Sequence, residues 1–322
     1  MSMPRSAASR SDEASVALAQ EIARSLTRAP RQLPSHYLYD RLGSSLFEAI
    51  CRLPWYRIAK VEQRLLDNHS ERIFEELGPV TSVVELGPGS GEKLATLISA
   101  RTVRNVRVHL VDVSAEALEQ ASRTLGALPD LSILTHQATY EAGLASIGRH
   151  DAVAGKSLIV FLGSNIGNFD PAAAGALLLA IRAAVRCGDS LLLGADLVKP
   201  ERELVLAYDD PLGVTAAFNR NLLVRLNREL GSDFDLDGFE HHARWNANES
   251  RVEMYLVSMR RQRVRIRAAD LDITFEDGEA IWTESSYKYR VSELATMLTR
   301  AGFRVTGQWA EDGFALTLGE AV

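Results

Sequence analysis

The strongest constraint on the fold is an alternation of short apolar runs and amphipathic helical stretches that begins at Thr81. The alternation is typical of βαβ units, in which parallel strands are joined by helices of roughly 10–20 residues. It predicts an α/β fold with a doubly wound, Rossmann-like sheet of mostly parallel strands. The expected strands cover residues 82–86, 106–111, 132–135, 157–162 and 190–194.

The segments on either side of this alternation have a different texture. The first ~75 residues carry helical periodicity, and one of the helices is expected to follow a turn at Gly43-Ser44-Ser45. Beyond Asp196 two helices, an acidic loop and alternating strands are expected, which we interpret as an inserted second domain of α+β type. These elements cover residues 203–208, 214–230, 233–237, 251–258 and 263–268.

The α/β texture returns at the end of the chain. A helix over 292–301 precedes strands 304–309 and 314–318, which are predicted to close the sheet as a C-terminal β-hairpin around the turn at 311–313. We therefore expect an α/β core and a second domain assembled from two separate segments. The predicted division is a frayed N-terminus (1–14), a substrate-binding domain (15–60 and 199–287) and a ligand-binding core (61–198 and 288–322).

Composition excludes several classes of protein. Hydrophobic residues make up 46% and charged residues 24% of the 322-residue chain, as in ordinary globular proteins. The net charge of −6 argues against a nucleic-acid partner, because such proteins carry a basic surface. The two cysteines, Cys51 and Cys187, offer no disulfide framework. No apolar run follows the Ser/Arg-rich N-terminus, so neither a signal peptide nor a membrane partner is expected. The expected location is the cytoplasm.

The sharpest local motif is the glycine-rich stretch VVELGPGSGEK at residues 83–93. An apolar strand turns there into a helix, and glycines allow a tight turn and close approach by a ligand. The spacing of Gly87, Gly89 and Gly91 lacks the GxGxxG form of dinucleotide sites, and no Gly-Lys-Ser/Thr of a phosphate loop follows. Glu85 would also repel a pyrophosphate. A nucleoside ligand without phosphates is therefore favoured over a structural turn that binds nothing.

S-adenosylmethionine (SAM) fits this description. Its sulfonium is cationic, and its ribose hydroxyls require a carboxylate at the end of the next strand. Asp112 closes that strand and fills the role. Lys93, early in the following helix, is suited to the carboxylate of the methionine moiety, although an exposed lysine on a solvated helix face explains its spacing equally well.

A second polar stretch follows the strand at 157–162, at the sheet edge where α/β proteins bind ligands. Asn165 and Asn168 in this stretch are candidates for orienting a substrate, with turn formation as the alternative.

Taken together, the chain resembles the histidine-specific SAM-dependent methyltransferases that start ergothioneine biosynthesis. The resemblance spans nearly the whole chain, and its motifs lie in both expected domains in the same order. The motifs are YDRLGS (39–44), VELG (84–87), FLGSNIGN (161–168), AYDD (207–210), TAAFNRN (215–221) and TESSYKY (283–289).

The resemblance implies trimethylation of the α-amino group of L-histidine, through mono- and dimethyl intermediates, to hercynine. It implies SAM as methyl donor, with no metal. Matching positions imply SAM contacts at Gly87, Lys93 and Asp112. Members usually carry an acidic residue and then an aromatic residue for the adenine, whereas this chain has Thr139 and Tyr140 at those positions, so these two are our adenine candidates.

The resemblance also implies the residues that hold histidine. Tyr39 matches a tyrosine near the amine and is the candidate catalytic residue. The residues matched to the carboxylate and its surroundings are Tyr56, Asn168 and Tyr208, and those matched to the imidazole are Met254, Glu284 and Ser286. Gly163 is a further substrate-binding candidate.

Three alternatives stay open on the sequence. A methyltransferase of the same architecture could act on another amino acid such as tryptophan, although Glu284 and Met254 favour imidazole over indole. A non-catalytic SAM-binding module and a nicotinamide-dependent oxidoreductase are the others. The adjacent His241 and His242 lack the spacing of metal ligands.

Overall fold

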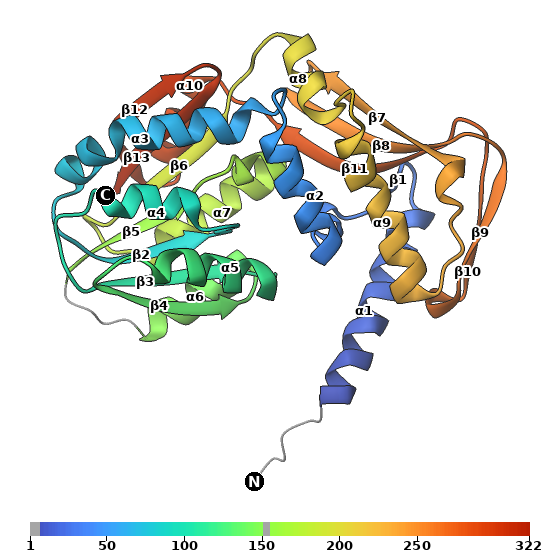
Figure 1. Ribbon diagram of the computed structural model, residues 1–322, viewed down its shortest axis with the longest axis horizontal. Helices are drawn as coiled ribbons and strands as arrows, with labels where there is room; N and C mark the ends of the chain where they lie inside the picture. The colour runs from blue at the N-terminus through green and yellow to red at the C-terminus, as the bar shows by residue number, and fades with distance from the viewer. Residues whose placement is uncertain (1–6, 151–154) are drawn as a thin grey trace. The chain divides into compact units, whose positions relative to one another are not determined.

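The computed structural model of the chain describes residues 7–150 and 155–322 (Figure 1). The chain divides into two compact units, each built from separate segments. The first unit comprises Met1–Tyr56, Glu201–Ala247 and Arg251–Ser285. The second unit comprises Arg57–Pro200, Asn248–Ser250 and Ser286–Val322.

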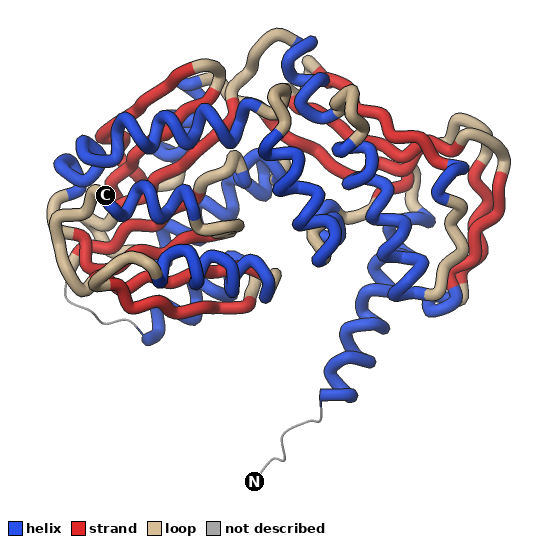
Figure 2. Tube along the Cα trace, viewed as in Figure 1, coloured by secondary structure: helices blue, strands red, loops and turns tan. Residues whose placement is uncertain are grey.

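A central sheet forms the framework of the second unit, and Figure 2 shows its strands in red. Among the described residues it has seven strands in the order β12-β13-β6-β5-β2-β3-β4. The five strands from β6 to β4 pair in parallel, whereas β13 runs antiparallel to both β6 and β12. The strands are β2 (Val80–Leu86), β3 (Val106–Asp112), β4 (Leu131–Gln137), β5 (Lys156–Phe161), β6 (Ser190–Asp196), β12 (Phe303–Glu311) and β13 (Phe314–Ala321). The predicted Rossmann-like sheet with its C-terminal β-hairpin is confirmed.

Helices cover both faces of this sheet. Helix α3 packs on α4 and on the β12–β13 hairpin, and α4 packs on α5. Helix α6 packs on α7, and α10 packs on the hairpin. These helices are α3 (Arg57–Leu77), α4 (Glu92–Ser99), α5 (Ala115–Gly126), α6 (Tyr140–His150), α7 (Pro171–Ala184) and α10 (Val291–Arg300), and the short 3-10 helix η2 covers Asn165–Asn168.

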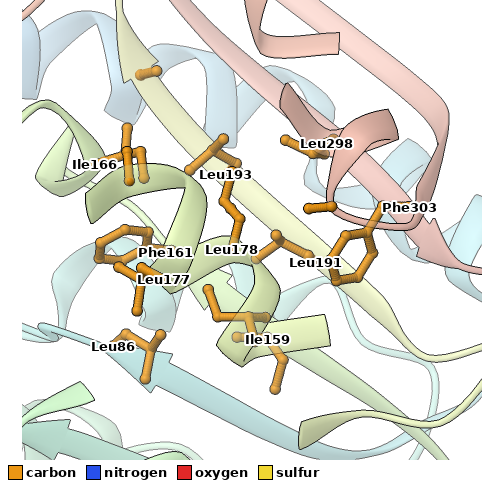
Figure 3. Close-up of a cluster of buried hydrophobic side chains, with 14 of the residues drawn as sticks. Leu86, Ile159, Phe161, Ile166, Leu177, Leu178, Leu191, Leu193, Leu298 and Phe303 are labelled. Carbon is orange, nitrogen blue, oxygen red and sulfur yellow. The ribbon is translucent and has the colours of Figure 1, made fainter. Parts of the chain in front are cut away.

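The core of the second unit lies between the sheet and helices α6, α7 and α10 (Figure 3). Its side chains come from alternate positions of the strands, for example Ile159 and Phe161 on β5 and Leu191 and Leu193 on β6. Each of these four is at most 3% exposed. Burial of such side chains stabilises the unit by roughly 1.5–3 kcal/mol apiece, which holds the carboxyl ends of the strands in fixed register.

The first unit has the α+β composition that the sequence predicts. A four-stranded sheet in the order β1-β11-β8-β7 carries α8 and α9 against β7 and β8, and α2 packs on α9. A separate two-stranded sheet pairs β9 with β10 in antiparallel fashion. The elements are α1 (Ala7–Thr27), β1 (Arg31–Gln32), η1 (Ser35–Leu38), α2 (Arg41–Arg52), α8 (Glu201–Tyr208), α9 (Val214–Leu230), η3 (Leu236–Gly238), β7 (Phe239–Asn246), β8 (Arg251–Ser258), β9 (Gln262–Ile266), η4 (Arg267–Ala269), β10 (Leu271–Phe275) and β11 (Ala280–Tyr287).

Two local predictions near the N-terminus are wrong. Gly43-Ser44-Ser45 is not a turn before a helix but lies inside α2, which is capped one turn earlier by Asp40, whose Oδ1 accepts from the Gly43 N–H at 2.8 Å. A glycine is needed there because a Cβ would collide with the carbonyl of Leu38. The terminus expected to be frayed over 1–14 is helical from Ala7 onward, and residues 1–6 lie outside the described residues.

Candidate active site

The glycine-rich loop lies between β2 and α4, at the carboxyl end of β2. Gly87, Gly89 and Gly91 have φ angles of 74°, 55° and 78°, in the left-handed region that side chains disfavour. A Cβ on Gly87 would lie 2.7 Å from Asn165 Nδ2 and 2.8 Å from the Tyr140 hydroxyl. The structure therefore brings Gly87, Tyr140 and Asn165 together, and a residue with a side chain at position 87 would fill the space between them.

Asp112 ends β3, next to the loop, as the sequence predicts. Its Oδ1 accepts from the Ser114 N–H at 2.8 Å. Burial raises the pKa of Asp112, and the hydrogen bonds from the Ser114 and Val113 amides oppose that effect. A half-buried carboxylate of this kind suits a pair of ribose hydroxyls, because charged hydrogen bonds compensate for its desolvation.

Thr139 and Tyr140 stand where α6 begins. Thr139 is exposed, and its Oγ1 accepts from the Ala142 N–H at 3.4 Å. The Tyr140 ring packs edge-on against Phe161 at 5.3 Å, and burial raises the pKa of its hydroxyl. Tyr140 thus faces the glycine loop, whereas the described contact of Thr139 is with the start of its own helix.

Lys93 is not simply an exposed lysine on a solvated helix face. Its ammonium forms an ion pair with Glu62 of α3. The Glu62 side chain is fully buried, and its Oε1 accepts from the Gly163 N–H at 2.8 Å. One carboxylate therefore ties Lys93 to the loop after β5. Sequence reasoning missed Glu62. The sequence does carry a signal for it, since this charged residue lies within the apolar stripe of α3 formed by Ile58, Val61, Leu65 and Leu66.

Glu85 lies beneath the glycine loop and is 2% exposed. Its Oε2 has no hydrogen-bond partner among the described residues. Burial raises the pKa of Glu85 from 4.5 to about 8; the positive charge of Lys93 opposes the rise, and the negative charges of Glu62 and Asp112 add to it. A nearby cationic ligand would favour the ionised form of this buried carboxyl, whereas a phosphate would add to the negative charges of Glu62 and Asp112.

Replacing Glu85 with glutamine is expected to stabilise the protein at alkaline pH. The folded-state pKa of about 8 exceeds the ordinary 4.5, so wild-type stability is lost as pH rises between these values. Glutamine does not titrate, so the variant's advantage should grow between pH 5 and 8 to on the order of 1–3 kcal/mol. Guanidinium unfolding across this range measures it, with the exposed Glu75→Gln of α3 as control. A pH-independent difference would contradict this role of Glu85.

The loop after β5 carries the other predicted residues of the second unit. Gly163 has a φ of 75°, and a Cβ added to it would lie 3.5 Å from both Lys93 Nζ and Asn165 Oδ1. Asn168 ends the 3-10 helix η2 and is exposed. Phe169 is the C-cap of this helix, and the next residue, Asp170, is the N-cap of α7, where its Oδ1 accepts from the Ala173 N–H at 2.8 Å. Gly163 thus belongs to the Lys93 cluster, and Asn168 presents its amide at the surface of the unit.

Aromatic rings gather in the first unit around the predicted substrate tyrosines. Tyr39 contacts Phe47 and Phe218, each at 5.5 Å between ring centroids. Tyr56 in turn contacts Phe47 at 6.1 Å and Tyr208 at 6.2 Å. The structure therefore links all three tyrosines through one continuous aromatic cluster, whose ring faces can attract a cation.

The backbone carbonyl of Tyr208 is hydrogen-bonded to a buried histidine. His241 Nε2 lies 2.8 Å from the Tyr208 carbonyl, and Asn219 Nδ2 lies 2.9 Å from His241 Nδ1. Because the carbonyl only accepts and the amide nitrogen only donates, His241 is a neutral ring that carries its proton on Nε2. Burial lowers the pKa of His241, which agrees with this neutral form. His241 therefore acts as a structural support, consistent with its lacking the spacing of a metal ligand.

The predicted imidazole contacts lie on neighbouring strands. Met254 on β8 is 1% exposed, and its carbonyl accepts from Thr283 Oγ1 of β11 at 3.1 Å. Glu284 on β11 is 8% exposed, and Ser286 follows two positions later on the same strand. Because side chains alternate along a strand, Glu284 and Ser286 project from the same face of β11. Ser286 also accepts from Lys288 Nζ at 2.9 Å, a contact that the sequence did not predict.

Neither a metal-ligand cluster nor a membrane-spanning helix occurs in the described part of the chain. In residues 7–150 and 155–322, no group of three or more histidine, cysteine, aspartate or glutamate side chains is arranged to hold a metal ion. Over the same ranges, every helix is too short or too polar to cross a lipid bilayer.

Comparison with known proteins extends across both units. The family model described as "Histidine-specific methyltransferase, SAM-dependent" matches residues 18–321. The chain is 42% identical over 312 residues to a histidine N-alpha-methyltransferase of Mycolicibacterium smegmatis, covering 95% of this chain and 96% of that protein. It is 26% identical to the ergothioneine biosynthesis protein 1 of Neurospora crassa, covering 82% of this chain and 32% of that protein.

Among solved structures, a SAM-dependent methyltransferase from Clostridium acetobutylicum aligns with a TM-score of 0.46 and 13% identity, covering 86% of this chain and 98% of that one. The family match extends over nearly the whole chain and includes the glycine loop, Asp112 and the strand that bears Glu284 and Ser286. The resemblance drawn from the sequence motifs is thereby confirmed. The chain belongs to the family of histidine-specific, SAM-dependent methyltransferases.

Proposed function

We propose that this protein transfers three methyl groups from SAM to the α-amino nitrogen of L-histidine and so forms hercynine, the first step of ergothioneine biosynthesis. The observation that carries the proposal is the family match over residues 18–321, which takes in both units. The mono- and dimethyl intermediates are then substrates of the same site. A cytoplasmic enzyme without a metal agrees with this chemistry.

The residues of the second unit fit SAM. The left-handed glycines leave space beside Tyr140 and Asn165, and Asp112 places a carboxylate at the end of β3 that can accept from the ribose hydroxyls. The buried acceptor of Glu85 favours a cation. We assign Gly87, Lys93, Asp112, Thr139 and Tyr140 to SAM, with Lys93 oriented by Glu62 toward the methionine carboxylate. When bound, SAM supplies an electrophilic methyl group on its sulfonium.

We assign the histidine contacts on the basis of the family motifs. Tyr56 and Asn168 hold the carboxylate, and Gly163 and Tyr208 border the same part of the substrate. The buried Glu284 accepts an imidazole N–H, Ser286 makes the second ring contact, and Met254 shapes the ring's surroundings. An unpaired buried carboxylate is costly, so Glu284 would discriminate strongly against apolar side chains.

The chemistry required of these residues is positioning. Each transfer would form an N–C bond from the amine lone pair while the bond between that methyl carbon and the sulfonium sulfur breaks and S-adenosylhomocysteine leaves. The α-amino group must therefore lose a proton and be neutral before each of the three rounds. Holding the reacting atoms in line supplies much of the acceleration. Tyr39 lies near the amine in this assignment, and its aromatic cluster with Phe47 and Phe218 suits the fixed trimethylammonium product through cation–π attraction.

The experiment that tests the proposal is a methylation assay across the amino acids with SAM. We expect histidine to be methylated with the highest kcat/KM, and tryptophan to react far less well because an indole offers Glu284 and Ser286 one N–H and no bare nitrogen. Methylation of tryptophan or another amino acid in preference to histidine would overturn the substrate assignment. Binding of SAM without turnover of any amino acid would identify a non-catalytic binding module instead.

A further inference from the structure

A fully buried lysine stands beside the predicted imidazole contact. Lys288 has no exposed side-chain surface, and its Nζ lies 3.0 Å from Asp196 Oδ2 at the end of β6. The same ammonium donates to Ser286 Oγ at 2.9 Å. Removing an ammonium and a carboxylate from water is costly, and an apolar pair of similar size often stabilises a fold better. The arrangement therefore calls for a role beyond stability.

A second lysine already neutralises Asp196. Lys199 Nζ lies 2.6 Å from Asp196 Oδ1, so the carboxylate has a cation on each oxygen. The backbone N–H of Asp196 donates to Ser164 Oγ at 2.9 Å, and its carbonyl accepts from the Tyr289 N–H at 3.1 Å. Asp196 is thus anchored independently of Lys288. What distinguishes Lys288 from Lys199 is its hydrogen bond to Ser286.

That hydrogen bond determines whether the Ser286 hydroxyl donates or accepts toward other groups. An ammonium group has three protons and no lone pair, so it can only donate. Ser286 Oγ must therefore accept from Lys288, and the hydroxyl proton of Ser286 is directed to an acceptor elsewhere. Glu284, two positions earlier on the same face of β11, is an acceptor when ionised. The strand thus presents one acceptor and one donor side by side.

We propose that Lys288 is a positioning residue that makes Ser286 a hydrogen-bond donor and so restricts the site to a ring with one N–H and one bare nitrogen. This inference rests on the proposed function, because it takes Ser286 to contact the imidazole. It adds that the neutral form of the histidine ring is the one recognised, and that the selectivity for its bare nitrogen originates in the Asp196–Lys288 pair.

The test compares histidine with β-(pyrrol-2-yl)alanine and β-(pyrrol-3-yl)alanine, which each replace one ring nitrogen with C–H. The wild-type enzyme should prefer histidine over both in kcat/KM, by about 10- to 100-fold, because a pyrrole leaves the Ser286 donor unpaired. Lys288→Met should reduce this preference about tenfold through KM for histidine, with KM for SAM unchanged. Lys199→Met removes the other cation on Asp196 and should retain the full preference.

Further variants keep the test decisive. If Lys288→Met fails to fold, Lys288→Leu serves, because it also removes the N–H donor to Ser286 and should reduce the preference to the same extent. Ser286→Ala should lose the preference, and adding Lys288→Met to it should have no further effect on selectivity. Equal losses in Lys288→Met and Lys199→Met, or full preference in Lys288→Leu, would overturn the inference. A wild-type enzyme that does not methylate histidine would instead overturn the proposed function.

Discussion

Replacing Glu284 with alanine should raise KM for histidine by about 10- to 150-fold, which corresponds to the loss of one hydrogen bond to a charged group, while the affinity for SAM changes by less than about twofold. Glu284 is 8% exposed and lies on β11 of the first unit, whereas the glycine loop and Asp112 belong to the second unit. The substitution leaves the bond from Trp282 Nε1 to the Glu284 carbonyl in place. Steady-state kinetics with each substrate varied in turn, and calorimetry with SAM, measure the two effects.

Two further variants separate charge from shape at this position. Glu284→Gln keeps the size of the side chain and one carbonyl oxygen, so its KM for histidine should fall between those of the wild type and the alanine variant. Glu240→Ala removes an exposed carboxylate from β7 of the same unit and should leave both constants unchanged. A Glu284→Ala enzyme with wild-type KM for histidine would show that another residue recognises the imidazole ring.

Replacing Asp112 with asparagine should weaken SAM binding by about 10- to 100-fold, because two hydroxyl donors lose their charged acceptor. Asparagine can keep its Oδ1 on the Ser114 N–H, so the turn after β3 is preserved while an amide N–H₂ group replaces the oxygen that would face the ribose. Calorimetry with SAM and S-adenosylhomocysteine measures the change, which should be similar for both ligands because they share the ribose.

The matched control is Asp130→Asn, which makes the same chemical change at an exposed loop position. Asp130 has a φ of 59°, a left-handed conformation that asparagine tolerates well, so folding and SAM affinity should be retained. Asp112→Asn with unchanged affinity for both ligands would exclude Asp112 from the ribose site.

The parts of this fold that sequence predicts are those fixed by local periodicity. The apolar strands β2, β3, β5 and β6 are continuous buried runs, and the residue that follows such a run must lie at the carboxyl edge of the sheet, which is how Asp112 and the loop after β5 could be placed. The hairpin of β12 and β13 was predictable from the turn at 311–313.

What sequence reasoning missed depends on contacts between distant segments. Gly43 suggests a turn until the Leu38 carbonyl beside it is known. Glu62 reaches Gly163 from 101 positions away, and Lys288 meets Asp196 at the end of β6. Periodicity indicates which face of an element is buried but not which polar group lies opposite, so a buried charge is visible in sequence only as an exception in an apolar stripe.

The most direct test of the central claim is to identify the product formed from histidine and excess SAM. Mass spectrometry should show histidine gaining up to three methyl groups, with three equivalents of S-adenosylhomocysteine released per trimethylated product. Proton–carbon NMR should locate all three methyl groups on the α-amino nitrogen. Methyl groups on a ring nitrogen, or no methylated histidine despite SAM binding, would contradict the proposed function.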